Sequence, residues 1–334
     1  MRRRKSAVLF GYGNYAKTVV VPGMAPYLAL ECVHEIDPAQ IASGAASAVS
    51  WSTSPIAEPA KYYDIYLIAG YHHTHAPLAL DALRRNAHAV VEKPICVDRT
   101  QLSELVSAMT ESKGRLFSCF HKRYLPFNRY AHRDLGLAPG EPISYHCIVY
   151  EVPLPILHWY LWPNSKSRLI SNGCHWVDHF LYLNEFCEWE QFNVFSAKDG
   201  TINCSVTLKN GALLTMVLTD RGSERIGVQD YIELRANGRT VKMTNGARYE
   251  AEDRSRILRR AHINKMSSYK NMYRQIGMAV AGVGAIGDTV HSVSVSAGLI
   301  LTLEEAFADR DYQARVPHSS LGVMIKDEAD SARP

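Results

Sequence analysis

With 334 residues, the chain is too long for one ordinary hydrophobic core, and its length favours about two domains. Apolar residues make up 47% of the chain and charged residues 21%, and the formal net charge is only +4, which is the composition of a globular protein. The basic residues form no helix-turn-helix, zinc-finger or RNA-binding pattern, so we expect no nucleic-acid partner. Seven scattered cysteines without a CxxC pair indicate reduced thiols, and no apolar run has membrane-spanning length. We therefore expect a cytoplasmic protein with no membrane partner.

A glycine turn follows the first predicted strand, residues 7–10. The turn is Gly11-Tyr12-Gly13-Asn14-Tyr15-Ala16, a GxGxxA pattern. Glycine permits a tight turn and the close approach of a pyrophosphate, and the helix that follows directs free N–H groups at that anion. A second predicted strand, residues 32–36, places Glu35 and Asp37 at its end, where an acid accepts hydrogen bonds from the adenosine ribose and repels a 2′-phosphate. The pattern favours NAD over NADP and Glu35 over Asp37; the alternative is that one or both acids cap the next helix.

Strands and helices alternate through the first 120 residues, which predicts a doubly wound parallel sheet. Predicted strands at residues 64–69 and 88–91 both lead into loops rich in polar residues, and ligands bind at the carboxyl ends of such strands. The candidate cofactor-binding residues of these two loops are Gly70, Tyr71, His75, Glu92 and Lys93. The histidines among residues 72–75 lack the further ligands of a zinc site, so we expect no metal.

The second half of the chain predicts a mostly antiparallel sheet. Alternating segments flank two hairpin turns, at Asn210-Gly211 and Asn237-Gly238. A proline-rich loop contains His158 and Trp159 among other aromatic residues, which suits a pocket wall, although core packing is the commoner reason for such a cluster. Residues 254–278 are expected to be helical. A helix is also predicted after Asn172.

The helix after Asn172 carries three polar residues on one face. His175, Asp178 and His179 are spaced three and four residues apart, so their side chains project from the same side. Asp178 can orient an imidazole or hold a lysine. The two histidines also have the HxxxH spacing of metal ligands.

Taken in order, these motifs make the chain resemble the Gfo/Idh/MocA oxidoreductases. The glycine turn, the loop ending in His75, the Glu92-Lys93-Pro94 triplet and the segment from Gly173 to Asp178 follow the family's order and rough spacing. The resemblance implies a Rossmann domain, residues 1–122, and an α/β domain, residues 123–325, with a large, mostly antiparallel open sheet. We expect residues 326–334 to be a disordered tail.

The resemblance also implies an activity and its residues. Family members mostly oxidise or reduce carbon–oxygen bonds of sugars, cyclitols and related compounds with NAD or NADP, often have a cis Lys-Pro bond, and often use the open sheet for oligomer contacts. We therefore expect a homodimer or homotetramer. Histidine titrates near about pH 6.5 and lysine near about 10.4, so His175 is expected to transfer the proton, Lys93 to bind the reacting oxygen and Asp178 to orient the pair. The substrate-binding candidates are Arg123, His158, Trp159 and Asn172.

Two positions depart from the family's pattern. Ser171 stands where many members have an acid four residues before the histidine, and serine cannot supply that negative charge; Gly70-Tyr71 replaces the usual Thr-Pro. Three functions stay open: an NAD-dependent dehydrogenase or ketoreductase of a polyol, sugar or sugar nucleotide, an imine or keto reductase in a biosynthetic pathway, and a non-catalytic NAD-sensing regulator. Both Lys93 and His175 are retained, which favours an enzyme.

Overall fold

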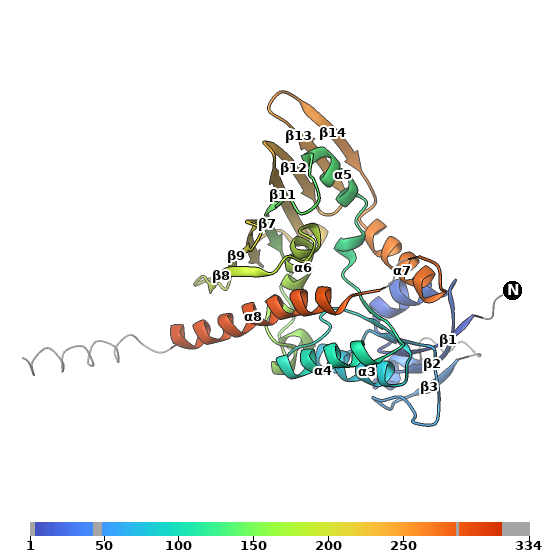
Figure 1. The fold of residues 1–334 in the computed structure, drawn as a ribbon. Coiled ribbons are helices and arrows are strands. Elements are labelled where there is room, and N and C mark those ends of the chain that lie inside the picture. Colours follow the sequence, from blue (N-terminus) through green and yellow to red (C-terminus); the bar gives the residue numbers. More distant parts are fainter. Residues whose placement is uncertain (1–3, 43–48, 285–286, 316–334) are drawn as a thin grey trace, which may run out of the picture.

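The protein is built on two β-sheets (Figure 1). The computed structural model describes residues 4–42, 49–284 and 287–315. The first sheet has six strands in the order β3-β2-β1-β4-β5-β6, and the second has eight in the order β14-β13-β12-β11-β7-β10-β9-β8. In Figure 1 the first sheet lies at the lower right and the second in the upper part of the molecule.

The first sheet is parallel throughout. Its strands are β1 (Lys5–Phe10), β2 (Leu28–His34), β3 (Ser50–Ser52), β4 (Ile65–Ile68), β5 (His88–Val91) and β6 (Leu116–Ser118). Successive residues of β1 enter different cores: Val8 and Phe10 pack on one face, and Ala7 and Leu9 on the other. Both faces are thus buried, as parallel sheets require. The predicted doubly wound sheet is confirmed.

Helices cover the two faces of the first sheet. The helical elements of this part are η1 (Ala16–Val20, a π-helical turn), α1 (Val21–Met24), α2 (Pro38–Ala42), α3 (His72–Arg84) and α4 (Arg99–Glu111). Side chains of α3 and α4 share the core that contains Val8, whereas α1 shares the other core with α7 (Ser267–Val280). Helix α7 comes from near the end of the chain, so the late sequence completes the early domain (Figure 1).

The second sheet is antiparallel except where β7 and β10 run parallel. Its strands are β7 (Ser144–Tyr150), β8 (Trp189–Ser196), β9 (Ile202–Leu208), β10 (Leu213–Thr219), β11 (Gln229–Ala236), β12 (Arg239–Thr244), β13 (Arg248–Glu252) and β14 (Ile257–His262). The predicted hairpins are confirmed: Gly211 lies between β9 and β10, and Asn237 and Gly238, between β11 and β12, both have positive φ angles.

One face of the second sheet is covered and the other is open. The covered face packs against α5 (Phe127–Leu135), α6 (Cys174–Leu183) and α8 (Val290–Arg315). On β7, Tyr145 and Cys147 are buried while Ile148 is half-exposed, so alternate residues point to the two faces. This is the open, mostly antiparallel sheet that was predicted.

The expected helix over residues 254–278 is wrong in its first part. Residues Ile257–His262 form strand β14, which pairs antiparallel with β13, and α7 begins only at Ser267. Arg259 donates to Asp134 Oδ2 at 2.7 Å and Arg260 to Glu250 Oε2 at 2.8 Å. Charged side chains therefore project from both faces of this edge strand, which hides the period of two that identifies a strand.

Short helical turns lie in the connecting segments, and one of them, η2, lies between the last strand of the first sheet and the second sheet. They are η2 (His121–Tyr124), η3 (Trp159–Leu161), η4 (Pro163–Ser165), η5 (Leu169–Gly173) and η6 (Glu224–Ile226). The limits 1–122 and 123–325 stay predictions, and the expected tail, 326–334, lies outside the described residues. In the described part of the chain, no helix combines the length and apolarity needed to cross a membrane.

Candidate active site

The glycine turn after β1 is shaped for a close backbone approach. Gly11 has φ +87°, and a Cβ at this position would lie 2.6 Å from the carbonyl oxygen of Ala69. At Gly13, by contrast, a Cβ would meet no atom within 4 Å. The first glycine thus lets two loops touch, and the second keeps the turn open on the side where a pyrophosphate approaches. Tyr12, Asn14, Tyr15 and Ala16 complete this turn at the start of η1.

Glu35 lies against this turn at the end of β2. The Tyr12 N–H donates to Glu35 Oε2 at 2.6 Å, and the Asp37 N–H donates to Oε1 at 2.9 Å. Each carboxylate oxygen has a further lone pair, so Glu35 can still accept from ribose hydroxyls. Asp37 is exposed and accepts from the Ala39 N–H at 3.0 Å, as a helix cap does. Glu35 thus lies against the glycine turn, and its place at the ribose stays a prediction, whereas Asp37 caps α2.

His75 joins the loops that follow β4 and β5. Its Nδ1 lies 2.7 Å from the Pro94 carbonyl oxygen and its Nε2 lies 3.1 Å from that of Gly70. The Lys93–Pro94 peptide is cis. Burial lowers the pKa of His75 to about 4, so its ring is neutral and has one N–H, which donates to only one of these two carbonyl oxygens at a time. Within residues 4–42, 49–284 and 287–315, no three His, Cys, Asp or Glu side chains are grouped to hold a metal ion.

Glu92 is directed at helix α7. Its carboxylate accepts a hydrogen bond from the Tyr273 hydroxyl, whose oxygen lies 3.4 Å from that of Tyr15. Burial raises the pKa of Glu92, although the Tyr273 hydroxyl and Lys93 oppose the shift. This acid, expected at the cofactor, thus connects the β5 loop to the helix that completes the domain.

Lys93 reaches from the first domain to the second. Its Nζ donates to the backbone carbonyl of Ser171 at 2.7 Å and lies 5.6 Å from the centre of the Tyr160 ring. Burial opposes the ammonium form, but Tyr160, Cys174 and the Glu92 carboxylate outweigh burial and raise the pKa of Lys93. Serine at position 171 supplies no acid, but its main-chain carbonyl accepts a hydrogen bond from the lysine.

His175 stands in the first turn of α6, four residues after Ser171. Its side chain is buried, and its Nδ1 has no hydrogen-bond partner among the described residues. The His121 ring lies 4.8 Å away, centre to centre. Burial, Lys93 and His121 together lower the pKa of His175 far below that of free histidine. His175 is therefore a neutral imidazole near the Lys93 ammonium.

A cavity of about 320 Å³ opens beside His175. Six of the residues that line it are His121, Lys122, Asn172, His175, Asp230 and Tyr269. The His121 ring stacks on Tyr269 at 4.0 Å, and its Nδ1 lies 3.0 Å from Ser268 Oγ. Asn172, a predicted substrate residue, also lines the cavity, and its Nδ2 donates to Glu151 Oε1 at 2.6 Å. The cavity wall is thus more apolar than polar, but it carries several groups that can exchange hydrogen bonds with a polar ligand.

Lys122 and Asp230 form a buried ion pair in the cavity wall. Trp176 Nε1 also donates to Asp230 Oδ2, at 3.0 Å, and the Lys122 Nζ lies 4.7 Å from the centre of the Trp176 ring. The sequence analysis missed these residues. Lys122 carries a usable signal, because His121 and Lys122 follow the carboxyl end of β6. Asp230, more than one hundred residues away, carries none.

Asp178 and Arg123, expected to orient the catalytic pair and to bind substrate, are bonded to each other. Arg123 donates to Asp178 through Nε at 2.8 Å and Nη2 at 2.5 Å, and it also donates to Asp288. Asp178 accepts a third bond from Ser296 Oγ at 2.6 Å, and no hydrogen bond joins it to Lys93. These buried, paired charges hold η2, α6 and α8 together, and the expected roles of the two residues stay predictions.

The aromatic loop packs against the loop after β4. His158 Nδ1 accepts from the Tyr160 N–H at 3.2 Å, so this histidine caps η3. The Trp159 ring lies 5.1 Å from that of Tyr71 and 4.7 Å from that of His72. Trp159 is thus a wall on the side of Lys93, while His158 has a structural partner.

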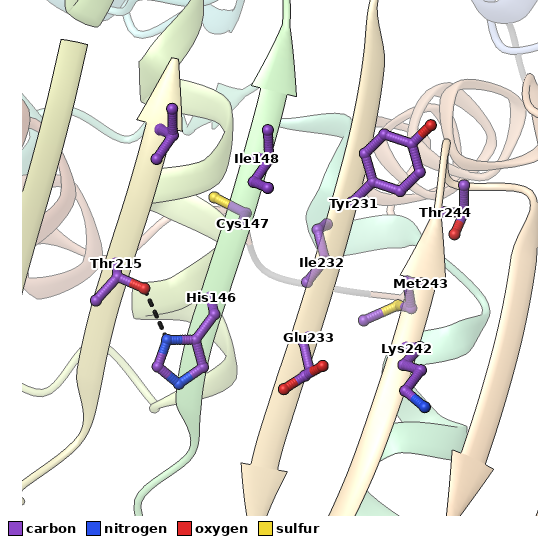
Figure 2. A pocket seen from close by; sticks show the side chains of 11 residues that line it. His146, Cys147, Ile148, Thr215, Tyr231, Ile232, Glu233, Lys242, Met243 and Thr244 are labelled. Carbon is purple, nitrogen blue, oxygen red and sulfur yellow. Dashed lines mark hydrogen bonds between the residues drawn. The ribbon is translucent and has the colours of Figure 1, made fainter. Parts of the chain in front are cut away.

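A second hollow, of about 440 Å³, lies on the open face of the second sheet (Figure 2). Figure 2 shows His146, Ile148, Tyr231 and Lys242 on strands β7, β11 and β12, and His146 Nδ1 lies 2.7 Å from Thr215 Oγ1. Neither Lys93 nor His175 lines this hollow.

Comparison with known proteins agrees with the geometry. Residues 5–120 match the Gfo/Idh/MocA oxidoreductase family with its NAD-binding Rossmann fold. The chain is 33% identical over 123 residues to the uncharacterized oxidoreductase YdgJ of Escherichia coli K12. The match covers 34% of this chain and 34% of YdgJ, so the likeness spans only about a third of that relative. In fold it is similar to a dehydrogenase from Chromobacterium violaceum (TM-score 0.80, 14% identity, 96% of this chain and 100% of that one). It is also similar to the WlbA dehydrogenase of Bordetella pertussis, solved with NADH and UDP-GlcNAcA (TM-score 0.73, 16% identity, 92% and 97%).

The glycine turn, the acid at the end of β2 and the parallel strand order define a dinucleotide-binding Rossmann domain. Residues 5–120 are similar to the NAD-binding Rossmann domain of the Gfo/Idh/MocA oxidoreductases, so this part of the chain is an NAD-binding domain of that type. Gly11, Gly13 and Glu35 fit that cofactor.

Proposed function

We propose that the protein is an NAD-dependent oxidoreductase that transfers a hydride to or from a carbon–oxygen bond of a sugar, cyclitol or related polyol. The observation that carries this proposal is the approach of Lys93 and His175 from different domains. Lys93 donates to the backbone carbonyl of Ser171, so its ammonium lies beside the turn that leads into α6, the helix that carries His175. His175 lines a cavity of about 320 Å³, large enough for a small polar ring.

The two side chains suit two tasks of the reaction, which are the transfer of the hydroxyl proton and the stabilisation of charge on the reacting oxygen. When bound, NAD accepts or supplies the hydride at its nicotinamide ring. In the direction of alcohol oxidation, the substrate hydroxyl proton passes to the neutral His175, and the charged Lys93 stabilises the oxygen as negative charge develops on it. In the direction of reduction, His175 returns the proton to that oxygen. The absent acid at position 171 is not needed in this scheme, because His175 is neutral without it.

A polyhydroxy substrate is supported by the cavity and by the structural neighbours. Asn172, Asp230 and two histidines offer several hydrogen-bonding groups within one small volume. The WlbA dehydrogenase was solved with UDP-GlcNAcA, and another neighbour is a UDP-N-acetylglucosamine 3-dehydrogenase from Acidithiobacillus ferrooxidans. We propose the sugar and polyol class on this basis.

Turnover of a substrate panel tests the proposal. The purified protein is incubated with NAD and a panel of polyols, sugars and UDP-sugars, and nicotinamide absorbance is followed. We expect turnover with at least one compound and a loss of about 10²- to 10⁴-fold in Lys93→Met and in His175→Asn, the range expected for general acid–base catalysis. Lys61→Met, which removes an exposed lysine, is the matched control and is expected to keep full activity.

Other outcomes would contradict the proposal in different ways. Tight NAD binding without turnover of any compound in the panel points to the sensing regulator, and turnover of imines alone points to the imine reductase. Parent-like rates in Lys93→Met and His175→Asn would remove the assigned roles even if the protein turns over a polyol.

We also propose that the open face of the second sheet joins copies of the chain into a homodimer or homotetramer. Ile148 and Tyr231 are both 53% exposed on this face, and large apolar side chains in a contiguous patch favour association (Figure 2). Native mass spectrometry gives the subunit count and any retained cofactor, and a monomer at micromolar concentration would contradict the proposal. A cytoplasmic location stays a prediction, which the seven free cysteines support.

A further inference from the structure

The Asp230 carboxylate has one oxygen in use and one without a partner. Oδ2 accepts from the Lys122 ammonium and from Trp176 Nε1. Oδ1 is buried, and no described residue donates a hydrogen bond to it. The side chain is only 6% exposed, and Asp230 lines the cavity beside His175. A buried carboxylate oxygen without a donor is costly, so its retention at a cavity wall points to a donor that a ligand supplies.

The position of Asp230 is fixed from three sides. Its backbone N–H donates to Asn245 Oδ1 at 3.0 Å, which anchors the start of β11. Lys122 and Trp176 hold the carboxylate plane, and each of them is adjacent in sequence to a cavity histidine, Lys122 to His121 and Trp176 to His175. The carboxylate is therefore held through Oδ2 in the wall of the cavity that the two histidines also line.

The charges around the cavity restrict what the donor can be. A ligand ammonium would be repelled by Lys122 and by Lys265, which lies in the same wall and donates to the Val228 carbonyl at 2.7 Å. A ligand carboxylate has no proton to donate and would be repelled by Asp230. A neutral hydroxyl meets neither objection and supplies the missing hydrogen bond.

We propose that Asp230 is a specificity-determining residue that accepts a hydrogen bond through Oδ1 from a second hydroxyl of the substrate, beside the one that reacts at His175. In this proposal Asp230 is a substrate-binding group and takes no part in the proton path. This inference rests on the proposed function, because it assumes a substrate in this cavity. It predicts that compounds with a single hydroxyl bind poorly.

Ligand binding to the protein saturated with NADH tests the proposal without requiring turnover. Calorimetry is done with myo-inositol and D-glucose, which carry several hydroxyls, and with cyclohexanol, which carries one. The parent is expected to bind at least one polyol, and Asp230→Asn is expected to weaken that binding about 10- to 100-fold, the value of a hydrogen bond to a charged group. Cyclohexanol binding and NADH binding are expected to be unchanged.

Two further variants separate binding from stability. Asp134→Asn removes another buried carboxylate of the second domain, one that is bound by Tyr249 and Arg259 outside the cavity, and it is expected to bind the polyol as the parent does. If Asp230→Asn fails to fold because it leaves Lys122 unpaired, the double variant Lys122→Met, Asp230→Asn removes both charges together.

The outcomes are distinct. Unchanged polyol binding in the folded Asp230 variants would show that water satisfies Oδ1, and it would overturn the inference while leaving the proposed function intact. Binding of cyclohexanol as tight as that of the polyols would also overturn it. Failure of the parent to bind any polyol, with normal NADH binding, would contradict the inference and the polyol assignment but not the NAD domain. Failure to bind NADH would contradict the proposed function itself.

Discussion

Replacing Asp178 by asparagine separates a structural role from a catalytic one. The carboxylate is fully buried and accepts two hydrogen bonds from Arg123 and one from Ser296. Asparagine keeps the shape but removes the negative charge, which leaves the buried Arg123 guanidinium with Asp288 as its remaining counter-charge. Breaking one partner of such a pair costs about 3–5 kcal/mol. For a domain of this size, that corresponds to a fall of roughly 6–20 °C in the melting temperature.

Thermal unfolding followed by circular dichroism measures this fall. The matched control is Glu58→Gln, because Glu58 forms an exposed pair with Lys61, and loss of that pair is expected to cost less than about 1 kcal/mol. Loss of a general acid or base typically lowers enzyme turnover by about 10²- to 10⁴-fold. Turnover of the Asp178 variant, measured well below its melting temperature, is expected to fall far less than this. Parent-like stability combined with a loss of that size would refute the reasoning and return Asp178 to the catalytic group.

Two more predictions concern the pH dependence and the cofactor. His175 acts as a neutral base, and its pKa lies well below the usual value for histidine. We therefore expect kcat/KM for alcohol oxidation to decline on the acid side only below about pH 6.5, as the imidazole becomes protonated. A decline that begins above about pH 7, which is higher than the pKa of a free histidine, would contradict this prediction. Glu35→Gln is expected to weaken NAD binding about tenfold and to reduce the preference for NAD over NADP, because the negative charge expected at the ribose is lost. Fluorescence titration with NADH and with NADPH measures both effects. An unchanged preference would show that other residues distinguish NAD from NADP.

Local patterns in the sequence predicted most of the fold. The apolar β1 followed by Gly11 and Gly13 needs a turn with positive φ and a close neighbour, and the structure has both. The Asn237-Gly238 pair forces the hairpin in the same way. In these cases the physical cause lies within a few residues, so a single chain segment contains the information. Strand β14 was missed because its neighbours, and not its own pattern, decide its conformation.

The candidate site was predicted only where a motif marks it. Lys93 and His175 stand at recognisable positions, and the structure brings them near each other. The partners of Asp178 could not be read, because Arg123 lies 55 residues away and becomes its partner only when η2 crosses to α6. The Lys122–Asp230 pair spans 108 residues in the same way. Contacts at such separations depend on the assembled fold and leave no local trace.

A crystal structure of the protein with NADH tests the central claim most directly. We predict that the pyrophosphate lies on the Gly11–Gly13 turn, that the adenosine ribose meets Glu35, and that the nicotinamide end points toward Lys93 and the cavity beside His175. A cofactor bound elsewhere, or one whose nicotinamide is turned away from both side chains, would contradict the account.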